Sequence, residues 1–241
     1  VFTGNNPVVT ISGTGNTVFG ELALNKSAGV VQLNRTVSIF TGVFFTSGNL
    51  DLNGNMLLLL ADPNGQLIGE NNNSRIIGNT GFVRKPATLN APSGVNAGNI
   101  GLLITSAQNL GATTIERYHY TVNNQNVRRV FRINPANNNS LNATLEFRYL
   151  DVELNAVDEN TLNLWRSVNG SSGWASVGGV ANAAQNSVTL NGLNDLSWFT
   201  PAPSNAALPI ILASFTATCA NNQVTLNWQT KQEQNTNRFE V

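Results

Sequence analysis

The strongest constraint on the fold is a short unit, Leu-x-Leu-Asn, which occurs three times between residues 21 and 60, once with Val as its first residue. Each unit is typical of a short strand, because its apolar residues alternate and its asparagine can turn the chain. The second and third units lie 19 residues apart, which suits one rung of a parallel β-solenoid with leucine over leucine and asparagine over asparagine. We therefore expect a short parallel β-solenoid-like region over residues 1–80. The units are Leu22/Leu24/Asn25, Val31/Leu33/Asn34 and Leu50/Leu52/Asn53.

The chain carries little charge, since only 11% of its 241 residues are Asp, Glu, Lys or Arg, against a usual share of about 25%. Asparagine is abundant instead, with 39 residues, as suits the surface of an extracellular β protein. The 13 basic and 13 acidic residues cancel and form no basic stripe, so we expect neither nucleic-acid binding nor attraction to an anionic membrane. The apolar run at residues 57–61 is far below the ~20 residues that cross a bilayer, so we expect no membrane insertion.

Residues 81–203 are predicted to form a second domain, an antiparallel β-sandwich. The Arg-Lys-Pro sequence at 84–86 is typical of a connector and sets the boundary near residue 80. About eight strands follow at intervals of roughly 10 residues, the spacing of a sandwich, and no segment has a helical pattern. The longest strand is expected over residues 141–154. Its apolar residues change parity after Tyr149, which indicates a β-bulge or a crossing between sheets.

Residues 204–241 contain two alternating strand patterns with Trp228 late in the second. We predict that they are the opening strands of a fibronectin type III-like domain. A sandwich of that kind needs about seven strands, so we expect this module to be incomplete within these residues. The chain begins at Val1 with neither an initiator Met nor a signal peptide, which indicates a processed protein or an internal fragment.

The same segment carries a family resemblance. It is similar to the fibronectin-like module that precedes the C-terminal sorting signal in many Bacteroidota proteins exported by the type IX secretion system. The matching residues are Leu208-Pro209, the Ser-Phe-Thr-Ala core at 214–217, Leu226 and Trp228, and Phe-Glu-Val at 239–241. The Leu-x-Leu-Asn stretch resembles the filamentous repeats of the same large surface proteins. The resemblance implies an extracellular or outer-cell-surface location, although the sorting signal itself is not among these residues.

Few side chains are suited to catalysis. His119 is the only histidine, so no His-based triad or His/Cys zinc cluster can form. We expect it on a sheet face or at the edge of the core, on the same strand face as Ile115 and Arg117. Cys219 is the only cysteine, which excludes an intrachain disulfide, and its apolar strand predicts a small core residue. We predict no catalytic, cofactor-binding or metal-binding residue.

Acidic side chains gather near the end of the longest predicted strand, where we expect a solvated loop. A weak Ca²⁺ site is the alternative, because calcium takes several oxygen ligands that often come from alternating positions. Two groups have part of that spacing: Asp151/Glu153, with Asp158 and Glu159 beyond them, and Asp51/Asn53/Asn55.

Trp165 and Trp174 flank the turn at Asn169-Gly170 and leave two interpretations open. If both rings are exposed, they form a platform that could stack on the sugar rings of a surface glycan. The interpretation that we favour places both side chains in the core of the sandwich, where large aromatic residues bury the most area.

These observations together predict a non-enzymatic structural or adhesive protein that is secreted or held at the cell surface. Solenoid ends expose unpaired strand edges, so we expect a homo-oligomer or a fibre that grows through strand edges or by donation of a strand to the incomplete final module. The alternative is an accessory region, carbohydrate-binding or surface-binding, of a larger type IX-secreted enzyme.

Overall fold

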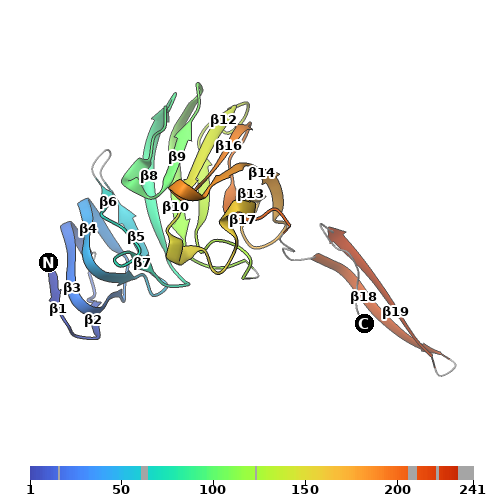
Figure 1. Cartoon of the computed structure of the whole chain (residues 1–241), viewed down its shortest axis with the longest axis horizontal. Helices are drawn as coiled ribbons and strands as arrows, with labels where there is room; N and C mark the ends of the chain where they lie inside the picture. The colour runs from blue at the N-terminus through green and yellow to red at the C-terminus, as the bar shows by residue number, and fades with distance from the viewer. Residues whose placement is uncertain (16, 61–64, 123, 206–210, 221–222, 233–241) are drawn as a thin grey trace.

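A computed structural model describes residues 1–241 with the exception of residues 16, 61–64, 123, 206–210, 221–222 and 233–241. The described chain is all-β, as predicted, and its only helical segments are four short 3-10 turns. Figure 1 shows the strands in three groups along the chain, beginning with a stack of parallel strands at the N-terminal end.

The N-terminal region is a β-solenoid of about four turns, which confirms the predicted fold. Its two longest strands lie side by side in parallel, and each bends at irregularities in the register. One long strand, β4, pairs in succession with three short ones, because the chain turns twice within the next rung. The strands are β1 (Phe2–Gly4), β2 (Val8–Ile11), β3 (Thr17–Leu33), β4 (Val37–Asp51), β5 (Met56–Leu59), β6 (Gln66–Ile68) and β7 (Ile76–Ile77).

The repeats stack as the sequence predicted for the second and third units. Val31 of β3 pairs with Leu50 of β4, and the two side chains are fully buried. The two asparagines meet at the surface, where Asn53 Nδ2 donates to Asn34 Oδ1 over 3.0 Å. The first unit stacks differently, since Leu22 pairs with Val43 rather than with another unit.

Near residue 80, where a domain boundary was predicted, the sheet is continuous. What changes there is the pairing of its strands, from parallel to antiparallel. Strand β8 (Phe82–Asn90) pairs with β5 in parallel and with β10 (Asn109–Tyr118) antiparallel. The connector expected at residues 84–86 is therefore wrong, since these residues lie inside β8. Pro86 is tolerated there because β5 pairs only with residues 82–84, so no neighbour on that side needs its N–H.

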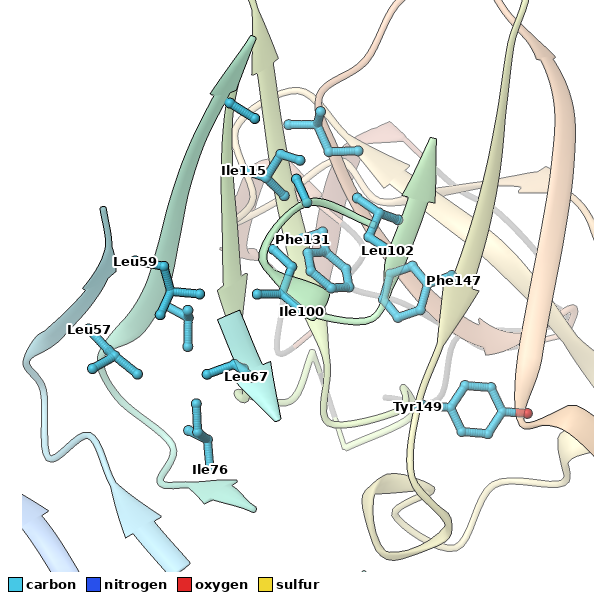
Figure 2. Packing of buried hydrophobic residues seen from close by; sticks show 14 of the residues in the cluster. Leu57, Leu59, Leu67, Ile76, Ile100, Leu102, Ile115, Phe131, Phe147 and Tyr149 are labelled. Carbon is cyan, nitrogen blue, oxygen red and sulfur yellow. The ribbon is translucent and has the colours of Figure 1, made fainter. Parts of the chain in front are cut away.

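The sheet continues from β10 through four more antiparallel strands. A second, four-stranded sheet lies against it and completes the sandwich. Phe131 and Phe147 meet between the two sheets, edge to face, with ring centroids 4.9 Å apart. Figure 2 shows that their cluster extends to Leu57 and Leu59 of the solenoid, so one core serves both regions. The added strands are β11 (Val130–Pro135), β17 (Trp198–Pro203), β13 (Leu162–Ser167) and β14 (Ala175–Gly178), and in the second sheet β15 (Val180–Asn182), β16 (Ser187–Leu193), β12 (Ala143–Arg148) and β9 (Leu102–Thr105).

Strand β12 is shorter than the sequence predicted. Its inward residues and the flanking Leu141 and Tyr149 are buried as expected. The chain then leaves the sheet and forms a 3-10 turn, η2 (Asp151–Glu153), so the change of parity marks the end of the strand and not a bulge or a sheet crossing. Val152 is accordingly 46% exposed. The other 3-10 turns are η1 (Ala97–Asn99), η3 (Glu159–Thr161) and η4 (Ala183–Gln185).

Two further strands, β18 (Ile211–Ala220) and β19 (Gln223–Gln232), form an antiparallel hairpin, which confirms the two predicted strands. The prediction for Cys219 is wrong, because its side chain is exposed. Phe215 and Trp228 are also exposed, by 57% and 39%, since the hairpin forms a two-stranded sheet of its own. The family motifs at Leu208-Pro209 and at 239–241 lie outside the described residues.

Candidate functional site

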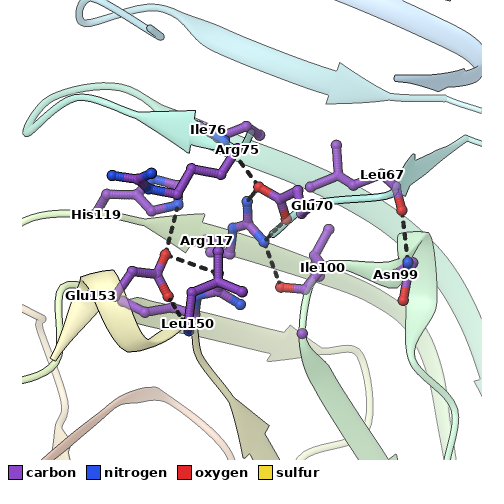
Figure 3. A network of polar contacts seen from close by, with 12 residues as sticks. Leu67, Glu70, Arg75, Ile76, Asn99, Ile100, Arg117, His119, Leu150 and Glu153 are labelled. Carbon is purple, nitrogen blue, oxygen red and sulfur yellow. Dashed lines mark hydrogen bonds and ion pairs between the residues drawn. The ribbon is translucent and has the colours of Figure 1, made fainter. Parts of the chain in front are cut away.

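Ionisable side chains gather where the solenoid meets the sandwich. In a chain with so little charge, five of them share this junction, and most are fully or almost fully buried. Figure 3 shows four of them, Glu70, Arg117, His119 and Glu153, which come from the loop after β6, from β10 and the residue beyond it, and from the 3-10 turn η2. The five residues are Glu70, Arg117, His119, Arg129 and Glu153.

The first ion pair joins Arg117 of β10 to Glu70, which lies between β6 and β7. Arg117 Nη1 and Nη2 donate to the two carboxylate oxygens of Glu70, each over 2.8 Å, and Nη1 also donates to the carbonyl oxygen of Ile100 over 2.9 Å. Burial alone would raise the pKa of Glu70, but the charge and hydrogen bonds of Arg117 outweigh burial and hold that pKa below its usual range. Glu70 is therefore a carboxylate at neutral pH.

The second ion pair joins Arg129, just before β11, to Glu153 in η2. Arg129 Nη2 donates to Glu153 Oε1 over 2.8 Å, and its Nη1 donates to the carbonyl oxygen of Arg148 over 3.0 Å. The turn places Glu153 inward, where the backbone N–H of Leu150 donates to its second oxygen over 2.9 Å. Both partners are almost fully buried, by 4% and 6% side-chain exposure.

His119 lies between these pairs, one residue beyond β10. It is 6% exposed and shares the inward face with Ile115 and Arg117, as the strand alternation predicted. Neither ring nitrogen has a hydrogen-bond partner among the described residues, and Nε2 lies 4.0 Å from Glu153 Oε1. Burial lowers the pKa of His119 well below its usual value, and the charges of Arg117, Arg129 and Arg75 lower it further. The ring is therefore neutral at pH 7.

A small pocket of about 100 Å³ opens beside this histidine. It is lined by Arg75, Arg128 and Glu153, together with residues 76–79 and Val152. Arg75 is half-buried and donates through Nη1 to the carbonyl oxygen of Asn72 over 2.6 Å. Arg128 is exposed. The pocket thus brings together cationic groups and an imidazole without hydrogen-bond partners.

A second polar cluster lies on the outer face of the large sheet. Glu116 of β10 is 2% exposed, and its Oε1 accepts hydrogen bonds from Arg84 Nε and Nη2 over 2.9 and 2.6 Å. Its Oε2 accepts from Tyr118 over 2.8 Å, and Arg132 lies 3.4 Å away. These arginines line a hollow of about 250 Å³ together with Thr114 and Asn134.

Half-buried aromatic rings adjoin this cluster. Tyr118 lies between Phe82 and Trp198, with ring centroids 5.1 and 5.2 Å away. Arg84 lies over the Phe82 ring and Arg132 over the Trp198 ring, at 5.2 and 5.6 Å from the centroids. We name Phe82, Tyr118 and Trp198 the aromatic row.

Trp165 and Trp174 are buried, but not in the core between the two sheets, where the favoured interpretation placed them. They are 1% and 4% exposed and pack with Val122, Val130 and Ala202 in a second hydrophobic cluster on the outer face of the large sheet. Trp165 Nε1 donates to the carbonyl oxygen of Pro203 over 3.1 Å. A platform that stacks on a sugar needs exposed rings, so these two buried side chains do not form one. Sequence analysis did not single out the aromatic row, whose one visible signal was the alternation of Glu116 and Tyr118.

The carboxylates considered for calcium have other roles. Glu153 is held by Arg129, and Asp158 caps η3 by accepting from the N–H of Asn160 over 3.0 Å. Asp51 accepts from Gln32 Nε2 over 3.0 Å and from the N–H of Asn53 over 2.9 Å. Within the described part of the chain, no three His, Cys, Asp or Glu side chains converge in a way that could hold a metal ion.

Comparisons with known proteins place no further constraint on the chain, since no family model, curated protein or solved structure matches it. Among the described residues, no helix has the length and apolar character that crossing a membrane requires.

Proposed function

We propose that this chain is a non-enzymatic structural or adhesive protein, located outside the cell or on its outer surface, that assembles through strand edges. The observation that carries the proposal is the edge of the solenoid formed by β1 and β2. Both strands pair with β3 alone among the described strands, so the other side of each is an unpaired edge.

The backbone of β2 is suited to accept another strand. The carbonyl oxygens of Pro7 and Ile11 accept hydrogen bonds from the N–H groups of Val30 and Asn34, each over 3.0 Å. In a parallel strand, the backbone N–H and C=O groups of successive residues point alternately to its two neighbours. The backbone N–H and C=O of Thr10, which lies between Pro7 and Ile11, therefore face the free edge. Edge strands that resist association usually carry Lys, Pro or a bulge, and β2, with the sequence VVTI, carries none of these.

The buried network supports a mechanical role. Its two carboxylates are each bound by an arginine. The Arg117–Glu70 pair ties the solenoid to the sandwich, and the Arg129–Glu153 pair joins two segments of the sandwich beside it. The low charge and the resemblance to type IX-secreted surface proteins support the proposed location.

Concentration-dependent assembly tests the proposal. Light scattering and electron microscopy of the purified chain should reveal elongated particles that grow with concentration. Val8→Lys, at a β2 residue that is 50% exposed, should abolish this growth. The matched control is Val180→Lys in β15, an edge strand of the second sheet, which is 74% exposed and should leave growth unchanged. Compact monomers at every concentration would refute assembly, and growth lost only in Val180→Lys would move the interface to the second sheet.

The aromatic row favours a second candidate, the accessory carbohydrate-binding or surface-binding region of a larger secreted enzyme. Aromatic rings offer apolar faces and the neighbouring guanidinium groups offer hydrogen-bond donors, a combination suited to a sugar ring. A glycan array should then report binding that Trp198→Ala removes and that Phe215→Ala, in the exposed hairpin, preserves. Binding unaffected by Trp198→Ala would exclude the row as the binding surface.

A further inference from the structure

We propose that the pocket beside His119 binds a small carboxylate. The inference is independent of the proposed assembly, because it rests on the wall of the pocket and not on the strand edges.

The first argument is the state of His119 itself. A buried polar group normally has a hydrogen-bond partner, and one left without any destabilises the folded state. A neutral imidazole has one N–H donor and one acceptor nitrogen, and neither nitrogen of His119 is satisfied by the described residues. Figure 3 shows the side chain of Arg75 reaching over the imidazole, with Glu153 beyond it. A carboxylate oxygen between His119 and Arg75 would accept hydrogen bonds from both.

The second argument is the balance of charge around the ring. Four arginines surround the junction, Arg117 and Arg129 within the network and Arg75 and Arg128 at the pocket. The carboxylates of Glu70 and Glu153 are bound by Arg117 and Arg129. Arg75 and Arg128 donate instead to the neutral oxygens of Asn72 and Asn155, which leaves an excess of positive charge in the wall of the pocket. Such an excess favours an anion, and guanidinium groups bind carboxylates through charge-assisted hydrogen bonds.

Size and charge together select a monocarboxylate. A pocket of about 100 Å³ limits the ligand to a small molecule. The carboxylate of Glu153, 4.0 Å from His119 Nε2, would repel a dianion such as phosphate more strongly than a monoanion. A metal cation would be repelled by the guanidinium groups of Arg75 and Arg128, which are not metal ligands.

The single histidine makes a direct test feasible. With the full chain labelled with ¹⁵N at histidine, the ring signals of His119 are the only ones in the spectrum. Titration with sodium acetate, against sodium chloride at equal ionic strength, should produce a saturable shift of these signals. Bound acetate should also raise the pKa of the ring, because the anion stabilises the imidazolium. Fluoroacetate, followed by ¹⁹F line broadening, gives a second readout from the ligand.

Variants localise the binding. Arg75→Gln should weaken acetate binding at least tenfold, whereas Arg132→Gln, which removes the same charge from the outer face, should leave it unchanged. Arg128→Gln, at an exposed position, replaces Arg75→Gln if that variant does not fold. N-acetylglycine distinguishes the source of the carboxylate, since binding comparable to acetate would indicate that the pocket admits a peptide C-terminus. Shifts no greater than those caused by chloride, or equal losses in Arg75→Gln and Arg132→Gln, would overturn the proposal.

Discussion

Arg117 of β10 and Glu70 of the loop after β6 form a bidentate ion pair, with both N–O distances at 2.8 Å. The two residues are 47 positions apart in the chain. The pair is a direct polar link between the solenoid and the sandwich. Arg117 is completely buried, so its charge depends on this partner and on the carbonyl of Ile100. A buried charge that loses its partner destabilises a protein far more than an intact pair stabilises it.

Glu70→Gln should therefore lower the free energy of unfolding by about 3–5 kcal/mol, because the charge of Arg117 remains buried without a counter-ion. Urea denaturation measures the effect. Glu146→Gln is the control, since Glu146 pairs with Arg148 at the surface and such pairs contribute about 0–1 kcal/mol. Equal losses in the two variants would contradict a special role for the buried pair.

The stability of the chain should depend on pH through His119. Its pKa in the folded state lies well below the ordinary value of 6.5, so between these two values the unfolded chain binds a proton that the folded chain does not. Stability therefore rises with pH in this window and falls as the pH drops below 6.5, by about 1.4 kcal/mol per unit for one proton. The pKa of Glu70 is lowered from 4.5, so loss of its contribution begins only in more acidic solution.

Urea denaturation between pH 6 and pH 5 measures this slope, and His119→Gln provides the comparison. In this variant, the slope of the free energy of unfolding against pH should be smaller by the contribution of one proton. This holds whatever the absolute stability of the variant. A slope that is identical in the two proteins would show that His119 is protonated equally in the folded and unfolded chains.

Gly29 should resist substitution more than a glycine of similar φ whose Cβ position is open. Its φ is +78°, and an added Cβ would lie 2.3 Å from the carbonyl oxygen of Asn6 in the neighbouring rung. Gly178 has a φ of +88° with no atom within 4 Å of its Cβ position, so Gly178→Ala measures backbone strain alone, about 1–2 kcal/mol. Gly29→Ala should cost more than about 3 kcal/mol, because the rung must also move. Thermal unfolding of both variants tests this, and similar melting temperatures would exclude the clash.

Sequence could predict the solenoid because its information is local. The alternation in each Leu-x-Leu-Asn unit defines the inward face, and the 19-residue spacing from Val31 to Leu50 defines the stacking. Asn34 and Asn53 then meet as a consequence of the same register. The inward face of β10, with Ile115 and Arg117, follows from alternation in the same way.

The candidate site could not be predicted, because its contacts depend on which distant segments meet. Alternation places Arg117 inward but does not identify Glu70, 47 residues away, as its partner. Likewise, the parity of residues 150–154 suggested a continuing strand, whereas the carboxylate of Glu153 turns inward to reach Arg129. Cys219 has an apolar neighbourhood in sequence, yet no second sheet within the described residues covers its hairpin.

Strand β8 closes the last rung, since it pairs with β5 on one side and with β10 on the other. The solenoid is thus attached to the sandwich at one end, through β8, and the number of its rungs can change without a change in that attachment. Duplicating one rung between β3 and β4 would lengthen the solenoid by one strand spacing, about 4.8 Å, without touching β8. The reach of the molecule is therefore adjustable in uniform steps, and a series of such duplications would serve as a molecular ruler.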